Sequence, residues 1–397
     1  MKLKKSYFFI LLLTLLISIN GIAQKSAYVD TAYFYQSKKF INSIIEYEIK
    51  AGDTLKNGNA WFYYISGNIM QTGNYLDDKM AGKWVTYYND GNKQRETFYI
   101  DGLKNGEVIS YHSNGKIKYE GFFKGDSLDG KMTLYYESGI IKEKRNYANN
   151  KLNGITEGFY PSGIINYRIN FNDSIKHGLF QRYYSNGQLQ EEGKIKGESF
   201  YGDYKSYYRD GKLEKEYSYN GFEIDGPYIV YHDDGSIMIK ANYINGKIEG
   251  QYYKIYKNGI PYESGKYRNG LREGLWTTFF DDSTVYMKGR YLKGEAQGFW
   301  NVYYRNSQLK QKGLYDRGVS QGIWKFYHEN GQLKTKGLYV DGKEDGHWVH
   351  FYENGQVKMD LYYKLGKLEG MLTAYDKEGN ILEQADFVDN KLVRKIK

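Results

Sequence analysis

The chain has 397 residues, a net charge of +9 and no cysteine, and 18% of its residues are aromatic, with 45 tyrosines among them. The mild charge forms no dominant basic block, which argues against a nucleic-acid ligand, and the lack of cysteine excludes a disulfide framework or a lipoprotein attachment site. A mean hydropathy of -0.72 beside so many rings favours exposed β-sheet, in which tyrosine is well accommodated.

Residues 1–23 have the pattern of a secretory signal peptide. Three lysines and an apolar run over residues 7–19 precede Gly21-Ile22-Ala23, whose small residues predict cleavage after Ala23. A membrane anchor is the alternative, but the run is shorter than the roughly 20 residues that a span needs. We therefore expect an exported protein, located in the periplasm, on the outer surface or in the medium, with a net charge of +6 after loss of three lysines.

From Gly58 onward, glycine recurs every 24 residues. The fourteen glycines that mark this period are Gly58, Gly82, Gly106, Gly130, Gly154, Gly178, Gly202, Gly226, Gly250, Gly274, Gly298, Gly322, Gly346 and Gly370. A fixed period of this length indicates a repeat protein in which each unit is buried only by its neighbours. We assign residues 58–397 to fourteen tandem repeats ending in a polar C-terminal cap, and residues 24–57 to a degenerate N-terminal cap.

Each repeat, numbered from its glycine as position 1, predicts a β-hairpin. Positions 6 and 7 are mostly aromatic, and turn pairs follow at positions 9 and 10, as in Asn330-Gly331, and at positions 20 and 21, as in Asp341-Gly342. We expect the first pair to form a type I′ turn, in which both central residues have positive φ. The predicted fold is all-β: an elongated, twisted antiparallel sheet of tandem 24-residue hairpins.

This turn predicts which side chains share a face. Position 7 would lie opposite position 12, position 3 opposite 16 and position 1 opposite 18, all on one face, with positions 6 and 13 on the other. In the repeat that begins at Gly322, Trp324 would lie over Gly337. Large rings would thus cover bare backbone, which accounts for both the aromatic residues and the glycines.

Residues 298–318 have the sequence G-F-W-N-V-Y-Y-R-N-S-Q-L-K-Q-K-G-L-Y-D-R-G, and residues 322–342 follow the same pattern. This pattern resembles the MORN-repeat variant of the YwqK-type antitoxin family. The resemblance covers about residues 58–397 and implies non-catalytic hairpin arrays that mediate protein contacts, oligomerisation or membrane-lipid association. Members are commonly named antitoxins or immunity proteins, and the export signal departs from a cytoplasmic antitoxin. Choline-binding cell-wall repeats are also similar but have a shorter period and use tryptophan more regularly.

No catalytic constellation emerges from the sequence. Residues 125–132 resemble a phosphate-binding loop but lack the Ser or Thr that should follow Lys131. His112, His232 and His328 all occupy position 7, where most repeats have another ring, and they lie too many repeats apart to share a metal. We expect no catalytic residue, no metal and no cofactor.

A tryptophan ladder is the first candidate for recognition. Position 3 is tryptophan in four successive repeats, at Trp276, Trp300, Trp324 and Trp348. Such a ladder is suited to stacking on sugar rings or anchoring a protein partner. The alternative is that the rings pack on Gly289, Gly313 and Gly337.

A basic face is the second candidate. Lysines at positions 13 and 15 are predicted to gather on it, namely Lys310, Lys334 and Lys358 at position 13 and Lys288, Lys312 and Lys336 at position 15. Glutamates take the corresponding places nearer the middle of the chain, at Glu192, Glu214 and Glu216. This face is suited to an acidic partner or anionic lipid, and the alternative is a solvated face that limits aggregation.

The sequence therefore predicts an exported, non-enzymatic scaffold that binds a protein of the cell envelope, in the manner of an antitoxin or immunity protein. The alternative is an envelope-surface binder of glycan or anionic phospholipid. A wet aromatic face would also allow two copies to pair as a homodimer.

Overall fold

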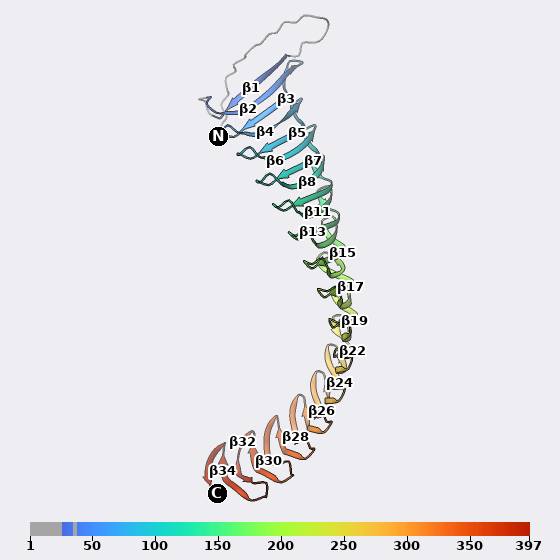
Figure 1. Ribbon diagram of the computed structural model, residues 1–397, viewed down its shortest axis with the longest axis vertical. Helices are drawn as coiled ribbons and strands as arrows, with labels where there is room; N and C mark the ends of the chain where they lie inside the picture. The colour runs from blue at the N-terminus through green and yellow to red at the C-terminus, as the bar shows by residue number, and fades with distance from the viewer. Residues whose placement is uncertain (1–25, 35–37) are drawn as a thin grey trace. The chain divides into compact units, whose positions relative to one another are not determined.

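The computed structural model describes residues 26–34 and 38–397, so the predicted signal peptide lies outside the described residues. Every regular element in these ranges is a β-strand, as predicted. The chain divides into two units, of which the first ends at Gly139 and the second runs from Ile140 to Lys397. Within each unit the strands follow one another in chain order (Figure 1).

The strands of unit 1 are β1 (Ser26–Tyr33), β2 (Ile41–Lys50), β3 (Asp53–Tyr63), β4 (Ile69–Leu76), β5 (Lys79–Tyr87), β6 (Lys93–Ile100), β7 (Leu103–Tyr111), β8 (Ile117–Lys124), β9 (Ser127–Leu128) and β10 (Gly130–Tyr135).

The strands of unit 2 are β11 (Ile141–Ala148), β12 (Lys151–Leu152), β13 (Gly154–Phe159), β14 (Ile165–Asn172), β15 (Ile175–Tyr183), β16 (Leu189–Lys196), β17 (Ser199–Tyr207), β18 (Leu213–Asn220), β19 (Glu223–Tyr231), β20 (Ile237–Ile244), β21 (Lys247–Ile248), β22 (Gly250–Ile255), β23 (Pro261–Arg268), β24 (Leu271–Phe279), β25 (Val285–Leu292), β26 (Glu295–Tyr303), β27 (Leu309–Asp316), β28 (Val319–Tyr327), β29 (Leu333–Val340), β30 (Lys343–Phe351), β31 (Val357–Lys364), β32 (Lys367–Leu368), β33 (Gly370–Tyr375), β34 (Ile381–Val388) and β35 (Lys391–Lys395).

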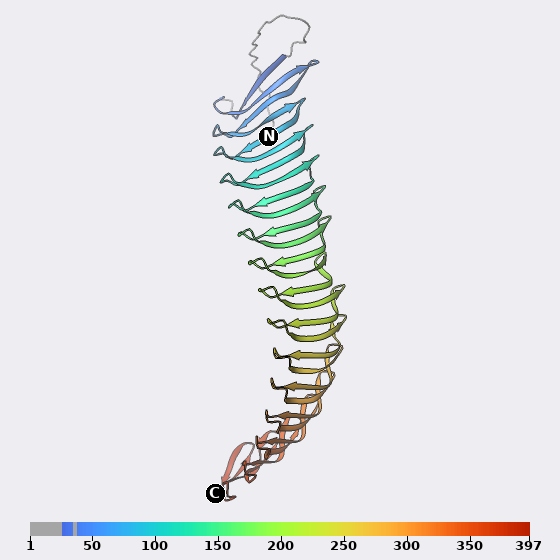
Figure 2. The same cartoon turned by 45° about the vertical axis from the view of Figure 1, so that its right-hand side comes forward.

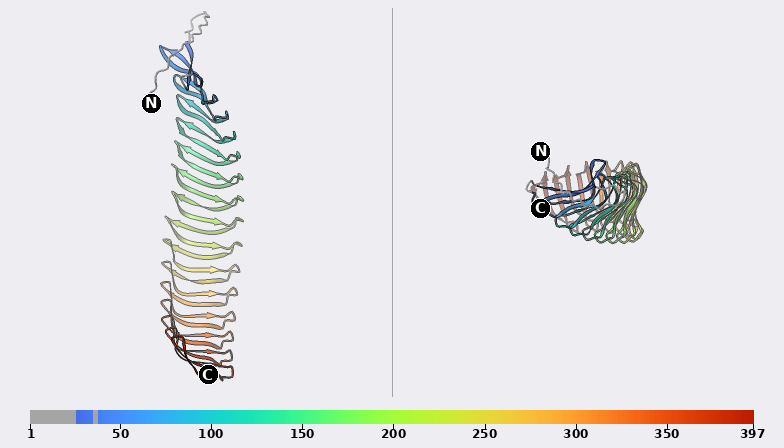
Figure 3. Two further views of the ribbon diagram at one scale, coloured as in Figure 1. Left: turned by 90° about the vertical axis from the view of Figure 1, so that its left-hand side faces the viewer. Right: turned by 90° about the horizontal axis from the view of Figure 1, so that it is seen from above.

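The predicted pairing of positions 1 with 18 and 3 with 16 is confirmed. Between β28 and β29, Gly322 lies opposite Tyr339 and Trp324 lies opposite Gly337. The strand pairs are antiparallel: from β27 to β30, for example, each strand pairs with the one before it, so a repeat forms a hairpin and consecutive hairpins pair side by side (Figure 2). The direction of the strands turns gradually along each unit (Figure 3), as the handed twist of β-sheets requires.

The predicted type I′ turn at positions 9 and 10 is wrong. Gly331 has a φ of 85°, but Asn330 stays outside the left-handed region. The His328 amide donates to the Gln332 carbonyl at 2.8 Å, and the Gly331 amide donates to the His328 carbonyl at 2.9 Å. These bonds close a three-residue loop that ends in a left-handed residue, the next most common hairpin connection.

The side chain of Asn330 explains this difference. Its Oδ1 accepts a hydrogen bond from the Gln332 amide at 2.9 Å, a local bond that stabilises the turn. The type I′ turn appears instead at positions 20 and 21, where Asp341 and Gly342 have φ of 48° and 78°. The same kind of residue pair therefore serves both turns with different backbones.

The loop carries a bulge that changes the predicted faces. Tyr327 at position 6, and not His328 at position 7, lies opposite Leu333, because the register shifts between Phe326 and Tyr327. We call the face that carries position 3 the inner face and the opposite one the outer face. Past the shift, a side chain at position 13 no longer lies on the same face as one at position 15.

Contacts in two repeats confirm this division. At position 13, Glu214 accepts a hydrogen bond at 2.9 Å from Ser206, which is at position 5 and therefore on the inner face. At position 15, the Lys312 ammonium lies 5.4 Å from the ring of Phe299, which is at position 2 on the outer face. The predictions that positions 6 and 13 share a face, and that the lysines at 13 and 15 do so, are therefore wrong.

The glycine that marks the period lies in a second bulge. All fourteen have positive φ, from 61° at Gly346 to 124° at Gly58. Around Gly346 the pairing jumps from Leu338 opposite Asp345 to Lys336 opposite Val349. Left-handed backbone, which side chains tolerate poorly, is thus a physical requirement at position 1.

In the repeats with tryptophan at position 3, the buried centre of the inner face consists of rings on glycines. Trp324 is 3% exposed, and a Cβ on Gly313 would stand 2.0 Å from its Cδ2 atom. Tyr315 meets the Trp324 ring edge-on, with centroids 5.1 Å apart. The ring therefore covers the glycine of the preceding repeat, whereas the sequence predicted that Trp324 would cover Gly337 of its own repeat; Trp348 covers Gly337.

Candidate binding surfaces

The rings at position 7 join successive repeats near the three-residue loops. The Tyr304 hydroxyl donates to the carbonyl of Tyr327 at 2.8 Å, and other repeats make the same bond. In their place, the Nε2 atoms of His112, His232 and His328 lie 3.1, 2.8 and 3.0 Å from the matching carbonyls. A carbonyl oxygen only accepts, so each Nε2 carries the hydrogen. The interpretation of these histidines as rings in place of rings is confirmed.

The asparagines at position 9 join the same loops. The Asn330 side-chain amide donates to the Glu353 carbonyl of the next repeat at 3.1 Å, and Asn306 donates to the Glu329 carbonyl at 3.0 Å. Each loop is thereby tied to the loop that follows it. The polar groups of this edge stabilise the stack of repeats.

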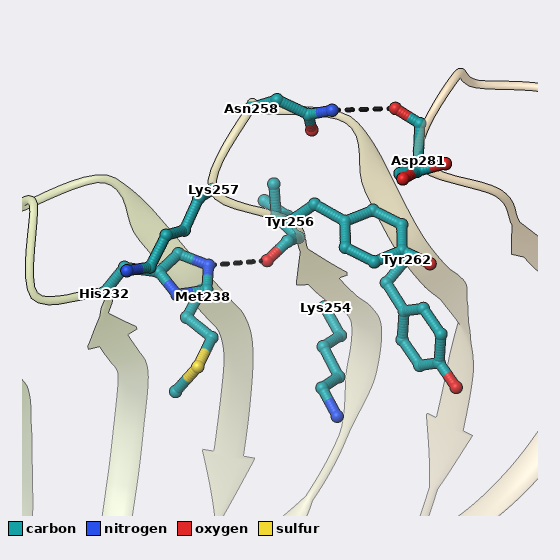
Figure 4. Close-up of a pocket in the computed structure, with 9 residues that line it drawn as sticks. His232, Met238, Lys254, Tyr256, Lys257, Asn258, Tyr262 and Asp281 are labelled. Carbon is teal, nitrogen blue, oxygen red and sulfur yellow. Dashed lines mark hydrogen bonds between the residues drawn. The ribbon is translucent and has the colours of Figure 1, made fainter.

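A shallow hollow of about 520 Å³ is lined by residues of three successive loops and the strands beside them (Figure 4). Two of its polar groups hold the stack together: His232 bonds to the Ile255 carbonyl, and Asn258 donates to the Asp281 carbonyl at 2.7 Å. The Lys254 ammonium lies 5.0 Å from the Tyr262 ring centroid. His232 and Asn258 are thus engaged with neighbouring repeats, and the hollow brings no nucleophile and base together.

The glutamates that the sequence grouped on one face are engaged by hydroxyl groups. Glu192 and Glu216 at position 15 accept hydrogen bonds from Tyr207 at 2.7 Å and Tyr231 at 2.5 Å. Burial and then these bonds raise the pKa of each tyrosine to about 12. Glu214 is on the other face, bonded to Ser206. These acids contribute to pairing between strands and form no common acidic patch.

The four tryptophans of the predicted ladder are buried. Trp276, Trp300, Trp324 and Trp348 are 3%, 7%, 3% and 4% exposed. Each packs on a glycine of the preceding repeat, as Trp300 does on Gly289. The rings therefore pack on glycines, as the alternative interpretation of the sequence stated. They leave little exposed surface for stacking on a sugar.

The position-13 lysines Lys310, Lys334 and Lys358 are exposed along the loop edge of the inner face. The ammonium groups of Lys310 and Lys358 lie 5.4 and 5.6 Å from the ring centroids of Tyr304 and Tyr352. His350 lies between Lys334 and Lys358, and its burial, followed by these two charges, lowers its pKa. Its Nδ1 atom is 2.9 Å from the Thr335 hydroxyl.

A second set of lysines crosses the outer face. Lys325 lies directly opposite Lys312 of the preceding strand and directly opposite Lys336 of the following strand. All three are exposed, and among the described residues no carboxylate lies within ion-pair distance of them. We call these three residues the lysine row. Lys325 was not identified from the sequence. The predicted register already pairs position 4 with position 15, and this pairing would have placed Lys325 beside Lys336.

An apolar row runs beside the lysine row on the outer face. It consists of the position-2 side chains Leu275, Phe299 and Ile323, which are 55%, 63% and 62% exposed. Phe299 and Ile323 lie opposite Leu314 and Leu338 at position 17. Water-exposed side chains of this size, repeated at one position, are typical of an interaction surface.

In the described ranges, 26–34 and 38–397, no group of three or more His, Cys, Asp or Glu side chains is arranged to hold a metal ion. No helix in the same ranges is both long and apolar enough for a membrane crossing.

These features define a class of protein, the tandem β-hairpin repeat protein. Nine segments of the chain match the family model of the MORN repeat variant. The matched segments are residues 80–101, 104–124, 128–149, 152–173, 176–196, 200–220, 224–245, 320–341 and 344–365. Each begins just after a type I′ or related two-residue turn and ends near the next one, so the family unit is the hairpin closed by the three-residue loop.

No curated protein matches the chain. Among solved structures, a TcdB2–TccC3 complex without its hypervariable C-terminal region is 10% identical, with a TM-score of 0.16 over 87% of this chain and 22% of that chain. The Photorhabdus luminescens Tc holotoxin pore is 12% identical, with a TM-score of 0.15 over 90% of this chain and 24% of that chain. The chain thus spans about a quarter of these proteins' length, and scores this low do not define a shared fold.

Proposed function

We propose that the protein is an exported, non-enzymatic scaffold that binds a protein partner in the cell envelope. The observation that carries this proposal is the apolar row, in which Leu275, Phe299 and Ile323 are each more than half exposed. The inner-face rings are buried and the loop asparagines bond to the next repeat, whereas these side chains remain mostly exposed to water. Large exposed apolar side chains at regular spacing are best explained by a partner that covers them.

An antitoxin- or immunity-like role is a narrower form of the same proposal. Its support is the resemblance of the repeats to the YwqK-type family, together with the signal peptide that the sequence predicts over residues 1–23. An exported protein of this kind would bind a toxin outside the cytoplasm. Such a role requires a partner held in a fixed ratio.

Capture from the native host tests this proposal. The full chain, tagged at its C-terminus, is expressed there and recovered from the envelope fraction at low and at high salt. We expect one protein in a fixed ratio to the bait at both salt concentrations, because apolar contacts resist screening. Recovery of the tagged chain in the cytoplasm, or without a stoichiometric partner, would contradict the proposal.

A second candidate function is binding to an anionic envelope surface, and the lysine row favours it. Lys312, Lys325 and Lys336 lack carboxylate partners among the described residues, as a surface for phospholipid headgroups would require. Retention on lipid or cell-wall material that salt releases would support this function. Glycan stacking has less support, because the tryptophans are covered.

A further inference from the structure

We propose that the outer face of β24–β29 docks an acidic, amphipathic segment of the partner protein. In this complex the lysine row pairs with the segment's carboxylates, and the apolar row contacts its apolar side. The inference rests on the proposed scaffold function and names the surface and the chemistry of the partner.

The first argument is electrostatic. Like charges directly opposite each other on neighbouring strands destabilise a sheet, and Lys325 has such a neighbour on both sides. In two other repeats the same two positions hold opposite charges: Glu157 lies 2.9 Å from Arg168, and Lys205 lies 3.8 Å from Glu216. The lysine row thus keeps an uncompensated repulsion that carboxylates from a partner would relieve.

The second argument is spacing. The side chains of the apolar row come from alternate strands β24, β26 and β28, so neighbours are about 10 Å apart at ~4.8 Å per strand. Residues seven apart in an α-helix are separated by about 10.5 Å along its axis. A helix lying across the strands therefore presents one apolar side chain per repeat to this row.

The third argument is the shape of the charged surface. The lysine row is one residue wide, and towards the C-terminus the same row continues with Val349, which is 5% exposed, and then Asp360. On one flank lies the apolar row, and on the other lie half-buried rings such as Tyr303 and Tyr327. A narrow line of charge with apolar flanks fits a linear segment better than the broad plane of a membrane.

Direct binding measurements test this docking surface. The probe is a fluorescent peptide of about 18 residues, which as a helix is about 27 Å long, with leucine at every seventh position and glutamate beside each leucine. The protein variants are the triple substitution Lys312→Glu, Lys325→Glu, Lys336→Glu and the matched control Lys310→Glu, Lys334→Glu, Lys358→Glu. Both variants change the net charge by the same amount. The first variant replaces three like charges with three like charges, so it adds no new kind of repulsion that would destabilise the fold.

We expect the wild-type chain to bind the glutamate peptide and not a counterpart with lysine in place of glutamate. The lysine-row variant should weaken binding about tenfold or more, and the control should stay close to wild type. Ile323→Ser should also weaken binding, by removing the centre of the apolar contact. Equal loss in the two triple variants would reduce the effect to net charge and overturn the proposal.

Vesicles of phosphatidylglycerol and phosphatidylcholine provide the competing outcome. If vesicles bind with the same dependence on the lysine row while the peptide does not bind, the surface is a lipid site and the proposal fails. The docking proposal and the scaffold function fail separately. A stoichiometric partner that still binds the lysine-row variant leaves the scaffold standing and rejects this surface.

Discussion

At the residue scale, Gly313 and Trp324 are the pair on which the inner face depends most clearly. A Cβ at Gly313 would lie 2.0 Å from Cδ2 of Trp324, which is itself buried against Tyr315. Gly313→Ala should therefore lower the free energy of unfolding by about 1–3 kcal/mol, the usual cost of an overpacked core. Thermal unfolding of the variant measures the loss.

Gly121 provides a matched control at the same repeat position. The nearest atom to a Cβ there is Cγ of Met132 at 3.3 Å, on a side chain that can move aside. Gly121→Ala should cost clearly less than Gly313→Ala. Equal costs would show that the ring contact does not set the requirement for glycine.

His350 predicts a dependence of stability on pH. Burial, and then the charges of Lys358 and Lys334, lower the pKa of His350 in the folded chain. At pH values between this lowered pKa and the ordinary pKa of about 6.5, the unfolded chain therefore binds a proton that the folded chain does not. The contribution of His350 to stability is therefore full above about pH 6.5 and declines as the pH falls below it. Melting temperatures of wild type and His350→Gln from pH 7.5 to 5.5 measure this. The wild type should lose more on acidification, and parallel curves would contradict the account.

At the scale of elements, the position-7 bonds should stabilise the contact between hairpins. His328→Phe removes the donor to the Phe351 carbonyl and should cost about 0.5–1.5 kcal/mol, whereas His328→Tyr restores the bond that Tyr304 makes one repeat earlier. The measurement is the unfolding midpoint of both variants in urea. A tyrosine variant as weak as the phenylalanine variant would show that ring packing, and not the hydrogen bond, dominates.

The lysine row predicts a stabilising substitution. Lys325→Glu would place opposite charges across from Lys312 and Lys336, each pair worth about 0.2–1 kcal/mol. Its melting temperature should exceed that of the wild type at low salt, with the difference reduced at high salt. Lys288→Glu is the control, because Lys288 lies opposite Thr277 and Asn301 and has no like charge to relieve. An equal gain in both variants would point to net charge.

The sequence predicted the hairpin, its period and most of its pairing, because periodicity and turn residues are local signals. It did not distinguish the two turns, since Asn330-Gly331 and Asp341-Gly342 look alike as residue pairs. The difference lies in the Asn330 side chain, which bonds to Gln332 and to the next repeat. The three-residue loop also carries a bulge, and the bulge places Lys310 and Lys312 on opposite faces. Simple alternation along a strand would have placed both lysines on one face.

At the scale of the whole molecule, the prediction of the candidate site was only partly useful. The tryptophans were named because they recur, but the packing of successive repeats buries rings that recur on the inner face. Lys325 was not named because its position-4 neighbours Thr277 and Asn301 are uncharged, so no column of lysines appears in the sequence. Lys325 joins the lysine row only because it pairs across strands with Lys312 and Lys336. Comparing the same position in successive repeats does not reveal such a pairing.

Capture from the envelope of the native host, with wild type, the lysine-row variant and the position-13 control as parallel baits, tests the scaffold account most directly. The account predicts one partner in a fixed ratio to wild type and control, and little of it with the lysine-row variant. Equal capture by all three baits would move the binding site elsewhere on the molecule. No stoichiometric partner with any bait would contradict the scaffold function itself.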